Sequence, residues 1–253
     1  GDHRDLHLSL RRQRQMCIRD RMHILVVGGG MGGTILANNL ARRLSGELEQ
    51  GSSKITMLSA SDKHMYQPGL LYVAVGKMST SELYRDQKSL LEPSIDFHVD
   101  PVEKFDLDNN SVTTKSGKKI SYDIICIATG SRGNAAGIPG LAENACQFYT
   151  EADALAMYKK LQKFEGGKVV VATGVPHKCP MSPLEITFFL IDYFKKRGIW
   201  DKVDLHYTYP IGRVHSLEPV AKWAAPEFDK EGVTYETLFN MKEVVPGLSL
   251  IHI

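Results

Sequence analysis

The stretch "HILVVGGGMGG" (residues 23–33) begins with an apolar run and passes directly into a cluster of glycines. The following segment "TILANNLARRL" (34–44) reads as a helix, and "KITML" (54–58) reads as a second strand. This order of strand, glycine turn, helix and strand is the context that a G-x-G-x-x-G pattern requires. The sequence therefore predicts an α/β unit that binds a dinucleotide.

Three glycines of this turn have separate expected roles. Gly28 permits the tight turn, Gly30 lets the backbone approach a pyrophosphate, and Gly33 lets the helix pack closely on the strand. The start of the helix adds unpaired N–H groups and the positive end of the helix dipole. The predicted cofactor-binding residues of the turn are Gly28, Gly30, Met31, Gly32 and Gly33.

The acidic residue that usually holds the ribose after the second strand is absent. Ser59 follows "ITML", and Asp62 comes three residues later. A serine hydroxyl can bond a ribose, although less strongly than a carboxylate does. We therefore expect Ser59 to contact the cofactor, and Asp62 is equally consistent with a solvated turn residue.

Short alternating strands in residues 95–130 predict a small antiparallel meander that returns to the sheet through "YDIICIATG". This layout resembles that of the flavoprotein reductases with two dinucleotide-binding domains. The resemblance implies FAD as the cofactor, with Ala128, Thr129 and Gly130 close to the flavin nucleotide. NAD at this first site is the second choice.

The segment "HMYQPGLLYVAVGK" (64–77) resembles the one that lies beside the flavin in sulfide:quinone oxidoreductases, flavocytochrome c sulfide dehydrogenases and type II NADH dehydrogenases. The resemblance implies that Pro68 approaches the isoalloxazine ring. A Pro-Gly turn that leads into a buried apolar segment explains the composition nearly as well.

The second half repeats the strand and the helix of a nucleotide-binding unit but changes the turn between them. A strand at 168–173 is followed by "GVPHKCPMSP" and a helix from about Pro183. Each proline of this turn lacks an N–H group. A turn with prolines and side chains at these positions cannot wrap a pyrophosphate closely, so we expect NAD(P)H to bind here poorly or not at all.

Cys179 occupies the altered turn. It lies just before a helix, whose positive dipole end favours a thiolate, and His177 and Lys178 are neighbouring cations or potential cations. We interpret Cys179 as a redox or nucleophilic residue; the alternative is a cysteine packed under a proline-rich loop. Cys126 lies inside an apolar strand and is interpreted as a small buried hydrophobic residue.

"GVPHKCPMSPLE" resembles the Lys-Cys-Pro-x-x-Pro-x-Glu segment of the sulfide:quinone oxidoreductase and flavocytochrome c sulfide dehydrogenase family. With the other motifs, the resemblance spans nearly all of residues 22–246. It implies FAD as cofactor, sulfide as donor, Cys179 as the redox cysteine, and a quinone or a cytochrome as acceptor. Some members carry another cysteine near the position of Tyr149; here the nearest is Cys146.

The expected fold class is α/β, with two Rossmann-like three-layer units, a small antiparallel meander, and the C-terminal part of the family fold missing. The ends "RQRQMCIRDR" and "LSLIHI" resemble translated sequencing-adapter sequence. The expected divisions are a non-native tail at 1–21, an FAD-binding domain at 22–133, a second domain with a degenerate phosphate turn at 134–247, and a non-native tail at 248–253.

Composition excludes several other classes. The net charge of +2 gives no footprint for nucleic acid, and the histidines and cysteines show no metal-ligand spacing. No secretory signal or membrane span is seen, so we expect a cytoplasmic protein or one that touches the membrane peripherally through the missing C-terminus. The alternatives are a type II NADH dehydrogenase-like reductase and an inactive truncated fragment.

Overall fold

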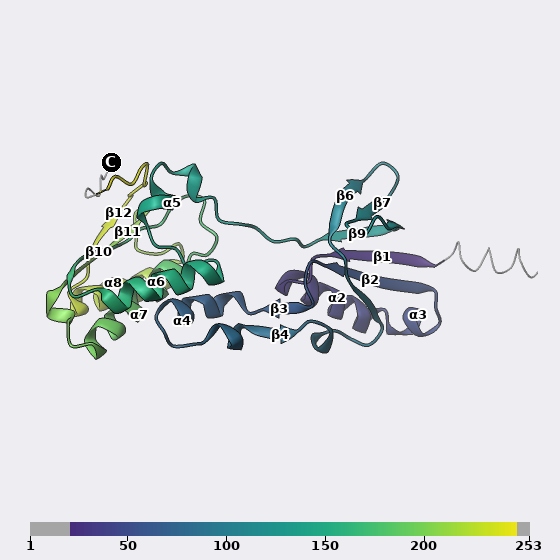
Figure 1. Ribbon diagram of the computed structural model, residues 1–253, viewed down its shortest axis with the longest axis horizontal. Helices are drawn as coiled ribbons and strands as arrows, with labels where there is room; N and C mark the ends of the chain where they lie inside the picture. Colours follow the sequence, from purple (N-terminus) through teal and green to yellow (C-terminus); the bar gives the residue numbers. More distant parts are fainter. Residues whose placement is uncertain (1–20, 247–253) are drawn as a thin grey trace, which may run out of the picture. The chain divides into compact units, whose positions relative to one another are not determined.

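The structure is a computed structural model that describes residues 21–246. These residues form two compact units: the first contains residues 21–66 and 84–130, and the second contains residues 67–83 and 131–246 (Figure 1). The expected tail at 1–21, apart from Arg21, lies outside the described residues, as do Cys17 and the expected tail at 248–253. Each unit is described by itself below.

The first unit is built on a parallel sheet with the strand order β5-β2-β1-β9. Its strands are β1 (Met22–Val27), β2 (Ser53–Ser59), β5 (Ile95–Val99) and β9 (Ile124–Ile127). Val27 at the end of β1 is in register with Leu58 of β2 and with Ile127 of β9. The strand order reverses at β1, and the carboxyl end of such a strand is where open α/β sheets bind their ligands.

Both faces of this sheet are buried, which explains why its strands read as continuous apolar runs. Ile24 and Val26 of β1 pack with Ala37 and Ala41 of helix α2 (Met31–Arg43). Their neighbours Leu25 and Val27 point to the opposite face and pack under the meander, against residues that include Val112, Ile120 and Tyr122. Cys126 of β9, expected to be buried, is partly buried and packs against the cluster on the α2 side.

The remaining elements of the first unit are short. The antiparallel meander consists of β6 (Val102–Asp106), β7 (Ser111–Thr114) and β8 (Lys119–Ser121). A two-stranded antiparallel ribbon is formed by β3 (Lys63–Met65) and β4 (Tyr84–Asp86), and helices α3 (Ser45–Glu49) and η3 (Lys88–Leu90) complete the unit.

The second unit contains a parallel three-stranded sheet with the order β10-β11-β12. Its strands are β10 (Gly167–Val171), β11 (Val203–Tyr209) and β12 (Thr234–Thr237), and its longer helices are α6 (Glu151–Lys163), α7 (Ser182–Lys196) and α8 (Glu218–Glu231). Shorter elements are α4 (Leu70–Ala74), α5 (Leu141–Asn144), η1 (Gln67–Gly69), η2 (Thr80–Leu83), η4 (Ala135–Gly137) and η5 (Trp200–Lys202).

Local sequence signals explain where these helices begin. Thr150 is the N-cap of α6, and its hydroxyl accepts a hydrogen bond from the N–H of Asp153 at 3.1 Å. Pro183 lies in the first turn of α7, where the missing N–H costs nothing. The buried side of α7 includes Ile186, Leu190 and Phe194. The helix that the sequence predicts from about Pro183 is therefore confirmed as α7.

Residues 67–83 pack with the second unit, although the sequence places them inside the first expected domain. Tyr72 of α4 lies against Phe189 of α7 with ring centroids 5.0 Å apart, and Lys77 forms an ion pair with Asp192 at 2.7 Å. The ring contact of Tyr72 with Phe189 and the ion pair of Lys77 with Asp192 therefore hold residues 67–83 against α7. The expected boundaries 22–133 and 134–247 remain predictions.

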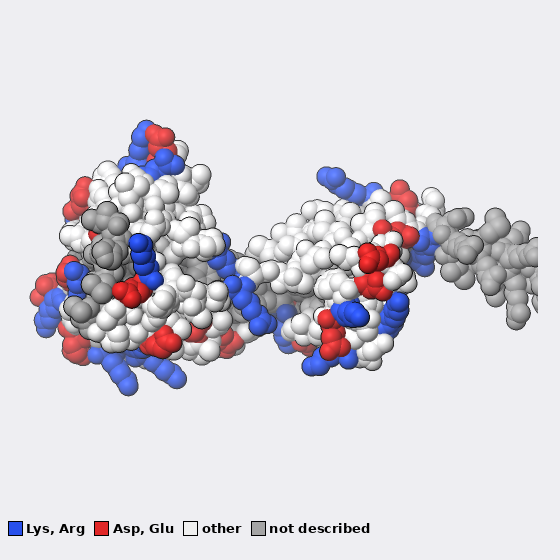
Figure 2. Space-filling model, turned by 90° about the horizontal axis from the view of Figure 1, so that it is seen from above, with Lys and Arg blue, Asp and Glu red and all other residues white. Residues whose placement is uncertain are grey.

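The fold class is confirmed, because both units are α/β structures with parallel sheets and the first carries the antiparallel meander. The surface is of mixed charge. Figure 2 shows basic and acidic side chains interspersed on the visible face of each unit. Ion pairs such as Arg42 with Glu92 (2.7 Å) join opposite charges there.

Close backbone packing holds α2 against β1. A Cβ atom added at Gly33 would lie 1.9 Å from the carbonyl oxygen of Gly28, and one added at Gly28 would lie 2.2 Å from the carbonyl oxygen of Ala128. Gly28 also has φ +116°, which side chains rarely tolerate. Both glycines are therefore required by the chain itself.

Gly33→Ala should lower the free energy of unfolding by about 1–3 kcal/mol, because the new methyl group overlaps backbone that cannot move freely. Gly32→Ala is the matched control: it lies one residue earlier in α2, and an added Cβ there has no atom within 4 Å. Alanine is favoured over glycine in helices, so this variant should be neutral or stabilised by up to about 1 kcal/mol. Urea unfolding followed by circular dichroism measures both, and equal stabilities would contradict the packing described.

Candidate functional site

The predicted cofactor-binding residues of the first unit gather at the carboxyl end of β1. Gly28 lies against Ala128, whose N–H donates to the carbonyl of Val27 at 2.7 Å. Thr129 and Gly130 follow on the exposed side. The glycine turn and the "ATG" segment, a hundred residues apart in the sequence, are thus brought together by the pairing of β1 with β9.

Gly30 differs from Gly28 and Gly33 because nothing in the chain requires it to be glycine. Its φ of −74° is open to any residue, and an added Cβ would meet no atom within 4 Å. It is the N-cap of α2, it supplies no side-chain cap, and the first turn carries no acidic residue. The first N–H groups of a helix have no intrahelical partner. The space beside Gly30 therefore fits a pyrophosphate that approaches the helix end closely.

Ser59 lies beneath this turn. Its side chain is only 7% exposed, and its hydroxyl accepts the N–H of Ser61 at 3.2 Å. A Cβ added at Gly29 would be 2.5 Å from that hydroxyl oxygen. Asp62 is exposed, and its carbonyl accepts the N–H of Gln87 at 2.8 Å. The contact of Ser59 with a ribose remains a prediction.

A buried polar cluster supports the turn from below, and sequence reasoning missed it. Gln87 is completely buried and donates to the hydroxyl of Thr34 at 2.9 Å. Nδ1 of His64 lies 3.0 Å from the Gln87 side-chain oxygen and 3.1 Å from the carbonyl of Gly29. Because both of these atoms are acceptors, Nδ1 carries the proton. Gln87 stands in a polar stretch, "YRDQK", so no pattern marks it as buried.

The second site is a pocket of about 230 Å³ in the second unit. Cys179, which is half-buried, lines it together with residues from three segments: Gln67, Pro68, Leu70, Leu71, Phe148, Tyr149, Lys178, Ser182 and Glu185. The structure therefore places Cys179 and Pro68, two separate predictions, on the walls of one pocket. Cys146 is exposed and does not line it.

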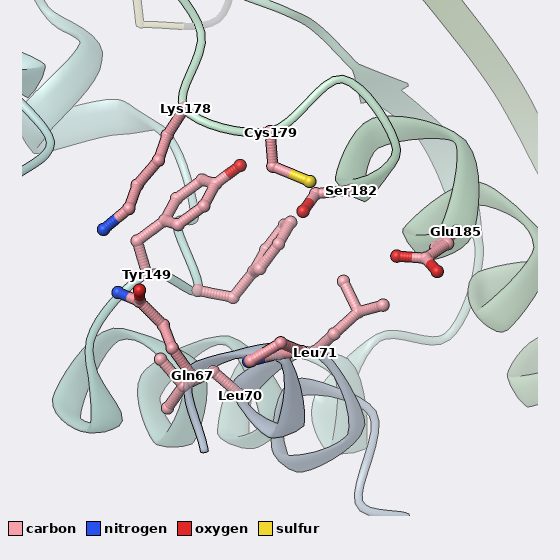
Figure 3. A pocket seen from close by; sticks show the side chains of 10 residues that line it. Gln67, Leu70, Leu71, Tyr149, Lys178, Cys179, Ser182 and Glu185 are labelled. Carbon is pink, nitrogen blue, oxygen red and sulfur yellow. The ribbon is translucent and has the colours of Figure 1, made fainter. Parts of the chain in front are cut away.

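Two hydroxyl groups of this pocket lie near Cys179. In Figure 3 the Tyr149 hydroxyl points toward Cys179, and Ser182 at the start of α7 lies beside the sulfur. Burial raises the pKa of the Tyr149 phenol, Cys179 raises it further, and a hydrogen bond with Ser182 opposes the shift. Tyr149 is thus a neutral donor at ordinary pH. Lys178 donates to the carbonyl of Ser131 at 3.0 Å.

The crevice at the carboxyl ends of β10 and β11 is filled by aromatic side chains. Tyr209 at the end of β11 is 1% exposed, and His215 in the following loop is completely buried. The Tyr209 ring lies 5.9 Å from His177 and 6.2 Å from His215, measured between ring centroids. In open α/β sheets this crevice is where a nucleotide binds.

Within residues 21–246, no helix has the length and apolar character needed to cross a membrane. In the same part of the chain, no three His, Cys, Asp or Glu side chains are grouped so as to hold a metal ion.

The fold and the glycine turn define a dinucleotide-binding α/β protein, and comparison with known proteins narrows this class. The sequence profile described as "Pyridine nucleotide-disulphide oxidoreductase" matches residues 22–171. The chain therefore belongs to the pyridine nucleotide-disulphide oxidoreductase family. Members of this family that are similar to the chain are FAD-binding flavoproteins, so this is a chain of an FAD-dependent oxidoreductase family.

Similar proteins include sulfide:quinone oxidoreductases and NADH dehydrogenase-like proteins. The chain is 27% identical to mitochondrial sulfide:quinone oxidoreductase of Mus musculus over 90% of its own length and 51% of that protein. It is 35% identical to sulfide-quinone reductase of Aquifex aeolicus over 73% of its own length and 42% of that protein. The X-ray structure of the sulfide:quinone oxidoreductase from Aquifex aeolicus matches with a TM-score of 0.77 at 28% identity, covering 89% of this chain and 53% of that one. The chain spans about half the length of these relatives.

Gly30→Ala should leave the unfolding temperature within about 2 °C of the parent, because the site is open and its φ is ordinary. The affinity for FAD should fall at least about tenfold, because the methyl group occupies the space that the pyrophosphate needs. Titration followed by flavin fluorescence measures this. Gly46→Ala, an open helical glycine in α3, serves as the control; unchanged affinity in the Gly30 variant would contradict the assignment.

Proposed function

We propose that the protein oxidises sulfide at Cys179 and passes the electrons through FAD to a quinone, or to a cytochrome if it follows the flavocytochrome branch. The observation that carries the proposal is the pocket in which Cys179 lies beside Tyr149, Lys178 and the N-terminus of α7. A redox cysteine must be reachable and near positive or donor groups. A thiol packed among aliphatic side chains would not meet these requirements.

The proposed chemistry balances with one external acceptor. Hydrosulfide and the Cys179 thiol together give a Cys179 persulfide, one proton and two electrons. FAD, when bound, accepts the two electrons and a proton and delivers them to the final acceptor. The glycine turn with Gly28, Gly30, Met31, Gly32 and Gly33, and the "ATG" segment Ala128, Thr129 and Gly130, would hold FAD in the first unit; Ser59 would contact its ribose, and Pro68 would approach its ring.

The groups around the sulfur have separable roles. The α7 N-terminus stabilises negative charge on sulfur, because its first N–H groups and its dipole face the turn. The neutral Tyr149 phenol can donate a hydrogen bond to the sulfur anion. Glu185, the carboxylate that lines the pocket, can take up the proton through water.

An NADH-dependent reductase, the second candidate, is less well supported. It needs backbone donors for a pyrophosphate between β10 and α7. Pro176, Pro180 and Pro183 provide none, and Tyr209 and His215 fill the adjoining crevice.

A quinone acceptor further implies peripheral contact with a membrane, because such quinones partition into lipid.

Cys179→Ser should abolish reduction of bound FAD by sulfide, because serine forms no persulfide, while FAD affinity stays unchanged. Cys146→Ser, at an exposed position outside the pocket, should keep the parent rate. The measurement is the loss of flavin absorbance after sulfide or NADH is added anaerobically to the FAD-loaded protein. Reduction by NADH, or full sulfide reduction in the Cys179 variant, would overturn the proposal.

Tyr149→Phe should slow reduction by sulfide about tenfold to a hundredfold, because it removes the donor beside the sulfur. Binding of FAD should change little, because the substitution removes one hydroxyl group and leaves the glycine turn and the "ATG" segment unaltered. Tyr158→Phe, on the partly buried side of α6 outside the pocket, is the control. Stopped-flow absorbance gives the rate, and an unchanged rate would exclude Tyr149 from the reaction.

A further inference from the structure

Three polar aromatic side chains meet at the carboxyl end of β11 in the second unit. His177 comes from the loop after β10, Tyr209 ends β11, and His215 comes from the loop before α8. The ring centroids of His177 and His215 lie 5.9 Å and 6.2 Å, respectively, from the ring centroid of Tyr209. The chain thus brings three hydrogen-bonding groups into its own interior.

Each of the three presents a polar atom that has no partner among the described residues. These atoms are the Tyr209 hydroxyl, Nε2 of His215 and Nδ1 of His177, and all three are closed to solvent. The neighbouring Tyr207 shows the ordinary arrangement, since its hydroxyl donates to the carbonyl of Val214 at 2.9 Å. Buried polar atoms in folded proteins nearly always have a partner, so three together point to a bound group.

Hydrogen-bond roles identify the kind of group. Nδ1 of His215 accepts the N–H of Leu217 at 3.0 Å, so in the neutral ring Nε2 carries the proton. The Tyr209 hydroxyl is a second donor. Two donors without an acceptor, and Nδ1 of His177, which in the neutral ring can accept, therefore belong to rings that pack around Tyr209.

A water molecule satisfies all three atoms. Its oxygen accepts from Tyr209 and from His215, and one of its hydrogens is donated to His177, which gives the three bonds that buried waters typically make. A water is also neutral, so no charge is buried with it. With the His177 proton on Nε2, an anion could accept from the two donors but could donate nothing to Nδ1.

We propose that a buried water joins Tyr209, His215 and His177 and that it holds the Cys179 turn in place. His177 stands two residues before Cys179, and its side chain is held inward by this water. Lys178, between them, is held in the other direction by the carbonyl of Ser131. His177 is therefore a positioning residue for the turn that carries Cys179. This inference does not depend on the reaction at Cys179.

Tyr209→Phe tests the water through the sign of its effect. If a water bonds the hydroxyl, the variant leaves that water short of a partner, and the unfolding temperature falls by about 2–4 °C. Tyr207→Phe is the matched control. It breaks the direct hydrogen bond to the carbonyl of Val214, so its unfolding temperature should fall as well. If no water lies beside Tyr209, Tyr209→Phe removes a buried hydroxyl that has no hydrogen-bond partner. The unfolding temperature then rises, which overturns the proposal.

Alkylation of Cys179 tests the positioning role in a protein whose other cysteines (17, 126 and 146) are serine. Tyr209→Phe and His177→Ala should each speed reaction with iodoacetamide at least about threefold, and together no more than either alone, because both release one linkage. His177→Asn, whose side-chain oxygen can replace Nδ1 as an acceptor, should restore the parent rate. If the two substitutions together multiplied their separate effects on the alkylation rate, the role of His177 would be overturned. Failure of His177→Asn to restore the parent rate would overturn it as well.

A crystal structure of the unsubstituted chain provides the direct observation. Electron density for one water within hydrogen-bonding distance of the Tyr209 hydroxyl and of Nε2 of His215 supports the proposal. An empty chamber, or a direct bond between the two side chains, overturns it.

Discussion

The contact on which the first unit depends is the meeting of backbone with backbone at Gly28. The carbonyl oxygen of Gly28 lies against the Cα of Gly33 at the start of α2. The Cα of Gly28 in turn lies against the carbonyl group of Ala128. Three segments therefore converge where a single Cβ atom would separate them. The parallel pairing of β1 with β9 and the burial of α2 on the sheet both follow from this closeness. It also leaves the helix N-terminus open beside Gly30, which is where an anionic group can approach.

The second unit has the same strand, turn and helix but uses its turn differently. Prolines replace backbone donors, Tyr209 and His215 fill the crevice, and the half-buried Cys179 lines a pocket. A nucleotide site needs exposed N–H groups at a glycine turn, whereas sulfur chemistry needs one reachable thiol among donors. The two requirements compete for the same loop. In this chain the loop carries a cysteine that lines a pocket and prolines that lack N–H groups.

Much of the fold follows from local pattern. Apolar runs predicted β1 and β2, the strand-turn-helix order predicted β10 and α7, and the G-x-G-x-x-G spacing placed the glycine turn. The excursion of residues 67–83 into the second unit escaped prediction, because its apolar composition suits burial against either unit. Gln87 escaped as well, since a fully buried amide in a polar stretch has no periodic signal. Its place is decided by partners from β3 and α2.

The sequence by itself determined the glycine turn, the parallel α/β class and the unusual cysteine, because these depend on residue type and on spacing along a few neighbouring turns. Only the tertiary structure decided that Pro68, Tyr149 and Cys179 share one pocket and that the rings of His177 and His215 pack beside Tyr209. Those groupings join loops from separate strands and helices. Such loops meet only after the sheet has formed and the helices have packed, and no local pattern records that meeting.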